Sequence, residues 1–231
     1  MNNILNINNL KFKWRGEKNF RLNLKNYSIK KEKKVIIYGK SGIGKSTLLN
    51  LISGILKPNS GEIIINNTDI NGLNSIKKDK FRANNLGVIF QQFNLLDYAS
   101  PLINILLPCY FTGFKKENKK YFHNRAFNLA NKLGLEKNIL LRKKSKNLSV
   151  GQMQRIAIIR SIINKPKLIL ADEPTSALDD DNKKKFLNLL LEVCNLEKTT
   201  LLMVSHDISL TNYFDESLSL ESIATDYENI N

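Results

Sequence analysis

The sequence contains few residues that could stabilise a fold through covalent bonds or metal ions. Only two of its 231 residues are cysteine and two are histidine, so we expect neither a disulfide framework nor a Cys/His metal cluster. The longest apolar run, around Leu102–Leu107, is far shorter than the roughly 18 residues that span a bilayer, and the start lacks the order of a signal peptide. We therefore expect a protein of the reducing cytosol that neither crosses nor leaves through a membrane by itself.

Charge is abundant but unevenly distributed. With 42% hydrophobic and 25% charged residues, the chain can build one compact core, which predicts a single domain over residues 1–231. The net charge is +15, yet residues 1–57 and 115–170 carry +11 and +13 while residues 171–231 carry −9. The basic residues are mainly lysine, 29 of 36, beside 31 asparagines and 26 isoleucines. Two explanations stay open: a surface for a polyanion or lipid, and the codon bias of an AT-rich genome.

Short runs of apolar and β-branched residues alternate with helical stretches. This alternation predicts an α/β fold with a mostly parallel sheet. The expected strands are Val35–Tyr38, Glu62–Ile65, Gly87–Phe90, Lys167–Ala171 and Thr199–Val204.

About 75 residues between the third and fourth of these strands show few strand signals. Within them Phe122, Ala126, Leu129 and Leu133 recur at helical spacing, and Gly134 stands where a helix would end. We therefore expect a helical subdomain over 93–165, inserted into a core made of 1–92 and 166–231.

A phosphate-binding loop follows the first buried strand. Gly39 and Gly44 are separated by four residues and followed by Lys45 and Ser46, with helical sequence beyond. Glycines let the loop turn its N–H groups toward phosphate, and the helix N-terminus adds positive potential. Lys45 is expected to reach the β- and γ-phosphates, and Ser46 to bind Mg²⁺. The alternative is a glycine-rich turn that binds nothing.

A second segment suited to Mg²⁺ and phosphate chemistry is the apolar strand "LILAD", which ends in Asp172 and is followed by Glu173. Neighbouring side chains on a strand point in different directions. Asp172 is therefore expected to hold Mg²⁺, while Glu173 orients or deprotonates the attacking water. Without the phosphate loop, two acids that cap a strand before Pro174 would explain the pattern equally well.

Three further motifs are informative in combination with these segments: "LSVGQMQR" at 148–155, "SALD" at 176–179 and "VSHD" at 204–207. With the phosphate loop, Gln91 and the acidic strand they follow the motif order of the ATP-binding-cassette (ABC) ATPases, which the chain resembles from about Leu10 to Leu218. The resemblance implies a P-loop NTPase (RecA-like) fold with an antiparallel β segment near the N-terminus. It also implies ATP and Mg²⁺ as ligands, and pairing with a second copy or a paralogous cassette.

The resemblance also assigns roles by position. It implies that Glu173, His206, Gln91 and Lys45 are catalytic, and that Ser46, Gln91 and Asp172 hold the metal. Gln92 competes with Gln91, and Trp14 could be a core residue instead of an adenine-stacking one. The sequence departs from the family at Val150 and Met153, neither of which is expected to donate to phosphate. The implied nucleotide-binding residues are Trp14, Gly39, Lys40, Ser41, Gly42, Ile43, Gly44, Lys45, Ser46, Thr47, Ser149, Gly151, Gln152 and Asp179.

A cassette of this kind implies a membrane partner. The segment after Gln91 resembles the lipoprotein-release and macrolide-export type, so a permease is expected to dock near Phe93–Tyr110, although these residues could also be core. The protein would then be peripheral on the inner face of the cell membrane, where its basic insertion could contact anionic lipid. A cell-division cassette that relays motion without transport stays open as an alternative.

Two related classes are excluded, and no nucleic-acid partner is expected. Coiled-coil chromosome ATPases place hundreds of residues between the phosphate loop and the acidic strand, whereas here about 125 intervene. Translation factors of the family carry two cassettes in one chain, whereas this chain has one.

Overall fold

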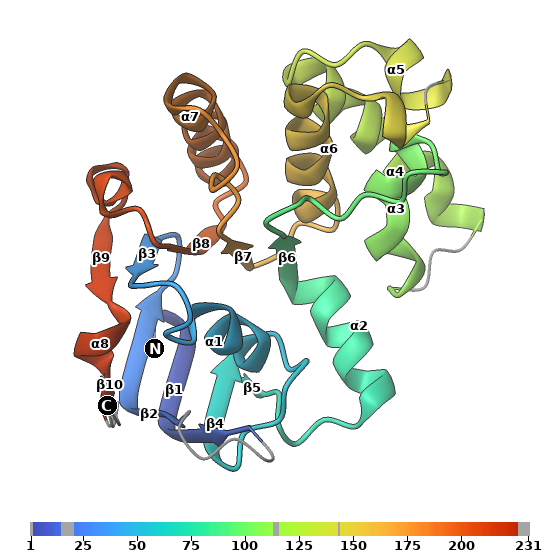
Figure 1. Ribbon diagram of the computed structural model, residues 1–231. Coiled ribbons are helices and arrows are strands. Elements are labelled where there is room, and N and C mark those ends of the chain that lie inside the picture. The colour runs from blue at the N-terminus through green and yellow to red at the C-terminus, as the bar shows by residue number, and fades with distance from the viewer. Residues whose placement is uncertain (1, 15–20, 113–115, 143, 226–231) are drawn as a thin grey trace.

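The computed structural model describes residues 2–14, 21–112, 116–142 and 144–225 (Figure 1). One of its two sheets is antiparallel, with strand order β10-β2-β1-β4-β5. The expected antiparallel segment near the N-terminus is therefore confirmed. The strands of this sheet are β1 (Asn3–Lys13), β2 (Arg21–Lys30), β4 (Ser60–Ile65), β5 (Thr68–Asp69) and β10 (Ala224–Thr225).

The second sheet is parallel throughout, with strand order β6-β7-β8-β3-β9, which confirms the α/β prediction. The expected strand at Glu62–Ile65 does not belong to it. That segment forms most of β4 and pairs antiparallel with β1, with Ile65 opposite Leu5. The parallel strands are β3 (Lys34–Tyr38), β6 (Leu86–Ile89), β7 (Leu168–Asp172), β8 (Thr200–Ser205) and β9 (Glu216–Ser219).

The strands β3, β6, β7 and β8 of the parallel sheet are buried on both faces, because alternate side chains of these strands enter different cores. Ile36, Ile169 and Met203 pack into a core with helices of the chain's second half. Leu170 and Leu202, next to two of them in sequence, pack instead against the antiparallel sheet and α1 (Lys45–Ile52). This double burial explains why these four strands are rich in apolar residues, and it holds their carboxyl ends in one place.

Helices α3 to α6 lie between β6 and β7 in sequence and gather to one side of the sheets in Figure 1. Gly134 has a φ of 67° just beyond α4, as expected for a residue that ends a helix. Within the described ranges no helix is long and apolar enough to cross a bilayer. The remaining helices are α2 (Ser75–Asn85), α3 (Pro101–Tyr110), α4 (Lys116–Lys132), α5 (Lys137–Arg142), η1 (Ser145–Asn147), α6 (Val150–Ile162), α7 (Asp180–Leu196), η2 (Ile208–Tyr213) and α8 (Leu220–Ile223).

Candidate nucleotide site

The loop between β3 and α1 has the backbone that a phosphate loop requires. Gly42 and Gly44 have φ values of 82° and 107°, in the left-handed region that favours glycine. Gly44 is also the N-cap of α1, and no side chain caps this helix. The first N–H groups of α1 and the positive end of its dipole are therefore available to a bound anion.

Lys45 lies inside the loop and is only 4% exposed. Its Nζ donates to the main-chain oxygens of Gly39 and Lys40, each at 2.8 Å, and lies 3.1 Å from Oε1 of Glu173. Three protein oxygens thus hold the ammonium group. Phosphate oxygens would offer it stronger, charged acceptors at the same place.

Asp172 and Ser46 meet at the end of β7. The Ser46 hydroxyl donates to Oδ1 of Asp172 at 2.9 Å. Burial, and to a smaller extent the charge of Glu173, raise the pKa of Asp172, while the Ser46 hydrogen bond opposes the rise. A partly buried carboxylate beside a hydroxyl is an oxygen donor pair suited to Mg²⁺.

The Glu173 carboxylate lies between two other predicted catalytic residues. One of its oxygens contacts Lys45, and the other lies 2.7 Å from Nδ1 of His206. Its backbone has a φ of 43°, which few residues other than glycine adopt, and its N–H donates to the main-chain oxygen of Val204. This conformation directs Glu173 to partners different from those of Asp172, as the sequence predicted.

Gln91 completes the wall of the site. It lies two residues beyond β6, and its Nε2 donates to the Ser176 hydroxyl at 3.0 Å. Its neighbour Gln92 does not line the site, so the geometry favours Gln91 as the functional glutamine. The resulting cavity of about 270 Å³ is lined by Ser41, Gly42, Gly44, Lys45, Ser46, Thr47, Gln91 and Glu173.

The sequence profile described as "ABC transporter" matches residues 22–176, well over half of the chain. The chain belongs to the ABC transporter family. As an ABC cassette it binds and hydrolyses ATP.

Curated relatives match this cassette over most of its length. It is 38% identical over 211 residues to the "Lipoprotein-releasing system ATP-binding protein LolD" of Wigglesworthia glossinidia brevipalpis, covering 91% of this chain and 90% of the relative. It is also 38% identical over 214 residues to the "ABC transporter ATP-binding protein YxdL" of Bacillus subtilis, covering 92% and 81%.

A solved structure supports the same family. The ATP-binding cassette MJ0796 of Methanocaldococcus jannaschii, in a dimer described as a post-hydrolysis state bound to ADP and Pi, superposes on this cassette with a TM-score of 0.79. The two chains are 33% identical, and the match covers 93% of each.

The signature residues Ser149, Gly151 and Gln152 are not among those that line the cavity of this cassette. Ser149 is the N-cap of α6. Its hydroxyl accepts from the Gln152 N–H at 3.3 Å, and the Gln152 side chain accepts from the Ser149 N–H at 3.1 Å. The two residues form a capping box. The first turn of α6 is therefore held by the cassette's own side chains.

Several other expected residues also lie outside the cavity lining, namely Trp14, Gly39, Lys40, Ile43, Asp172, Asp179 and His206. Trp14 is 39% exposed and packs edge-on against Phe12, with 5.1 Å between the ring centroids. An indole with this exposure is not a core residue, so the stacking role expected of Trp14 stays a prediction. Asp179 is the N-cap of α7, and its carboxylate accepts from the Asn182 N–H at 2.9 Å, which lowers the pKa of Asp179.

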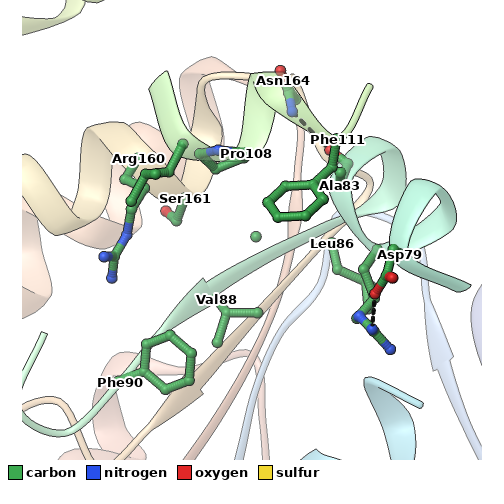
Figure 2. Close-up of a pocket in the computed structure, with 13 residues that line it drawn as sticks. Asp79, Ala83, Leu86, Val88, Phe90, Pro108, Phe111, Arg160, Ser161 and Asn164 are labelled. Carbon is green, nitrogen blue, oxygen red and sulfur yellow. Dashed lines mark hydrogen bonds and ion pairs between the residues drawn. The ribbon is translucent and has the colours of Figure 1, made fainter. Parts of the chain in front are cut away.

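A second cavity of the cassette, of about 290 Å³, opens between α2, β6, α3 and α6. In Figure 2 Arg160 and Phe111 flank the space above Val88. Most of its lining is apolar, with Ala83, Leu86, Val88, Leu107, Pro108 and Phe111 as the main contributors. We refer to this cavity as the α2–α3 groove.

Arg160, at the edge of the α2–α3 groove, was missed by the sequence interpretation. Its guanidinium donates to the main-chain oxygens of Phe93 and Asn94, the latter at 2.8 Å, and burial lowers its pKa to about 10. It thus ties α6 to the segment after Gln91. The signal in the sequence was a basic residue within the apolar run of α6, between Ile159 and Ile162.

The segment Phe93–Tyr110 supports both sequence interpretations. Phe93, Ile105 and Cys109 are buried in the core, as the alternative held. Ile103 and Tyr110 are exposed. The segment therefore contributes to the core and to the surface, and the groove beside it also draws on α2, β6 and α6, which the sequence did not indicate.

Proposed function

We propose that this cassette acts as one half of an ATP-driven dimer that powers a membrane permease of the lipoprotein-release type. The observation that carries the proposal is the position of the Glu173 carboxylate. It lies between Lys45 and His206, at a cavity walled by the phosphate loop and Gln91. Binding and water-activating groups therefore meet in one place.

The proposed reaction begins with an exchange of partners at Lys45. Phosphate oxygens of ATP replace the carbonyl and carboxylate oxygens that now hold Nζ, while the loop N–H groups bind the remaining phosphate oxygens. Glu173, released from Lys45, accepts a proton from the attacking water. His206 keeps Nδ1 on Glu173, which leaves Nε2 for the γ-phosphate. Gln91 lies at the same wall and orients the water.

The oxygen donors at the site fit Mg²⁺. The Ser46 hydroxyl and the Asp172 carboxylate are 2.9 Å apart, and the raised pKa of Asp172 shows a carboxylate that burial destabilises in its charged form. A divalent cation beside it would offset that cost. We propose that these two residues, with Gln91, hold the ion, which neutralises charge on the β- and γ-phosphates when bound.

A second cassette would supply what this cavity lacks. Ser149 and Gly151 lie outside the lining of their own site, and the Methanocaldococcus jannaschii relative was solved as a dimer. We propose that Ser149 and Gly151 of one copy close on the γ-phosphate held by the other, with Asp179 facing the joint. The closure would exclude water and stabilise the charge that develops on the transferred phosphoryl group.

The permease is proposed to dock at the α2–α3 groove. The groove is apolar, and Phe90 in its lining stands directly before Gln91 in sequence. Arg160, also in the lining, contacts the Phe90 ring and donates to the main-chain oxygen of Asn94 on the other side of Gln91. Phe111, 60% exposed at its rim, offers an aromatic contact to an apolar helix of the permease. We propose that residues 93–165 move with that helix as one helical unit, and that the cassette lies peripherally at the inner membrane face. The relative named for lipoprotein release suggests the type of permease.

The deciding experiment is Glu173→Gln in the purified full chain. Because the amide cannot accept the proton of water, ATP hydrolysis should fall at least about a hundredfold, while ATP binding and ATP-driven dimerisation persist. Turnover is measured as phosphate release, binding by calorimetry and dimerisation by size-exclusion chromatography. Glu192→Gln, on an exposed part of α7, is the matched control and should hydrolyse normally. Hydrolysis by Glu173→Gln at the parental rate would refute the assigned role.

A further inference from the structure

Lys183 and Asp207 join the first turn of α7 to the segment that carries His206. The Lys183 Nζ lies 2.7 Å from Oδ2 of Asp207 and 3.4 Å from Oδ1 of Asp180. The side chains of Lys183 and Asp207 are only 18% and 25% exposed. A partly buried pair of this kind is screened less by solvent than an exposed one, and it joins the two segments directly.

The other contacts of the Asp207 side chain stay within its own turn. Its Oδ1 accepts from both the N–H and the hydroxyl of Ser209, and the main-chain N–H of Asp207 donates to the Ser205 hydroxyl. The hydrogen bond with Lys183 lowers the pKa of Asp207 and raises the pKa of Lys183, so both are charged at neutral pH. The ion pair of Lys183 with Asp207 thus ties the turn of residues 205–209 to α7.

His206 depends on the same turn for its position. Only residues 206 and 207 separate the end of β8 at Ser205 from the start of η2 at Ile208. Residue 205 before this link is fixed by β8, which pairs with β7, and Asp207 is fixed by its ion pair with Lys183. The His206 side chain itself is half-exposed, and its Nδ1 lies within hydrogen-bond distance of the Glu173 carboxylate. Its ring position is therefore sensitive to how firmly Asp207 is held.

We propose that Lys183 is a positioning residue for ATP hydrolysis, which ties His206 to the first turn of α7 through Asp207. Asp179 is the N-cap of this turn. If the second cassette displaced Asp179, the movement would reach His206 through the side chains of Lys183 and Asp207. The inference rests on the proposed roles of His206 and Asp179. It adds a residue that acts from outside the nucleotide cavity.

The test is Lys183→Met in the purified full chain. Misplacing a catalytic group by about an ångström can cost up to a hundredfold in rate, so kcat should fall roughly tenfold or more while the Kd for ATP, measured by calorimetry, stays unchanged. Lys183→Arg, which keeps the charge and reach, should recover most of the rate. Lys184→Met is the matched control, because Lys184 is the next residue of α7 and its side chain is exposed.

Asp207→Asn removes the other partner and should reproduce the fall in kcat. It takes the place of Lys183→Met if that variant does not fold. Parental turnover in Lys183→Met, or in Asp207→Asn where Lys183→Met does not fold, would overturn the inference, and so would a loss of ATP binding that matches the loss of kcat. His206→Ala separates this outcome from failure of the proposed function. If His206→Ala is inactive while Lys183→Met is normal, the inference alone fails; if His206→Ala is active, the role proposed for His206 fails.

Discussion

Helices α1 and α6 both begin at a proposed phosphate contact, but their first turns differ. The N-cap of α1 is Gly44, with left-handed backbone and no side chain to accept from the helix N–H groups. The N-cap of α6 is Ser149, which forms a reciprocal capping box with Gln152. One helix leaves its N–H groups to a ligand, whereas the other satisfies two of them internally.

This difference explains how the two ends could divide their work. The first turn of α1 has unsatisfied donors and Lys45 beside it, so it gains hydrogen bonds as soon as nucleotide binds. At α6 the Ser149 hydroxyl accepts in the cap, and a hydroxyl that accepts can still donate its own proton. The cap therefore leaves the Ser149 hydroxyl proton for the contact that we propose with a phosphate held by another cassette.

Lys45→Ala should have the largest effect of the changes that test this comparison. Hydrogen bonds to charged groups contribute roughly 1.5–3 kcal/mol each, so ATP affinity should fall by about a hundredfold and hydrolysis should disappear with it. Titration calorimetry with ATP and Mg²⁺ measures the loss. Lys57→Ala, at an exposed lysine beyond the end of α1, is the control. If Lys45→Ala bound ATP as tightly as the parental chain, the first turn of α1 would not be the main phosphate contact, and its proposed difference from α6 would be lost.

Ser149→Asp should affect the dimer without affecting the single cassette. Aspartate is as good an N-cap as serine, so α6 and the melting temperature should be preserved. The ionised carboxylate has no proton to donate and repels phosphate, so dimerisation and hydrolysis should fall roughly tenfold to a hundredfold while each cassette still binds ATP. Sedimentation velocity with ATP measures the dimer. Dimerisation as strong as in the parental chain would show that Ser149 only caps its helix.

Much of the difference between the first turns of α1 and α6 could be predicted from the sequence, because it depends on local residue patterns. Glycine spacing predicts the turn before Lys45, and apolar runs such as Val35–Tyr38 predict strands buried on both faces. Which sheet a strand joins depends on partners far along the chain, and this is why the sequence predicted a strand at Glu62–Ile65 without indicating that it pairs with β1.

Side-chain pairings between distant segments could not be predicted for the same reason. Lys183 and Asp207 are 24 residues apart, and Gln91 and Ser176 are 85 apart. No local motif encodes either contact. Each arises because α7 and the ends of β6, β7 and β8 converge at one edge of the sheet, which only the three-dimensional fold shows.

Gln152→Ala should have the smallest effect. It removes the half of the capping box that accepts from the Ser149 N–H and leaves the Ser149 hydroxyl in place. A neutral hydrogen bond contributes about 0.5–1.5 kcal/mol, so the free energy of unfolding, measured by urea denaturation, should fall by about that amount and turnover by only a few-fold. Met153→Ala, one residue further along α6, controls for a general loosening of the helix. A drop in turnover as large as that of Ser149→Asp would mean that Gln152 contacts the phosphate itself. The first turn of α6 would then act as a ligand site like that of α1, and the contrast between the two helix ends would not hold.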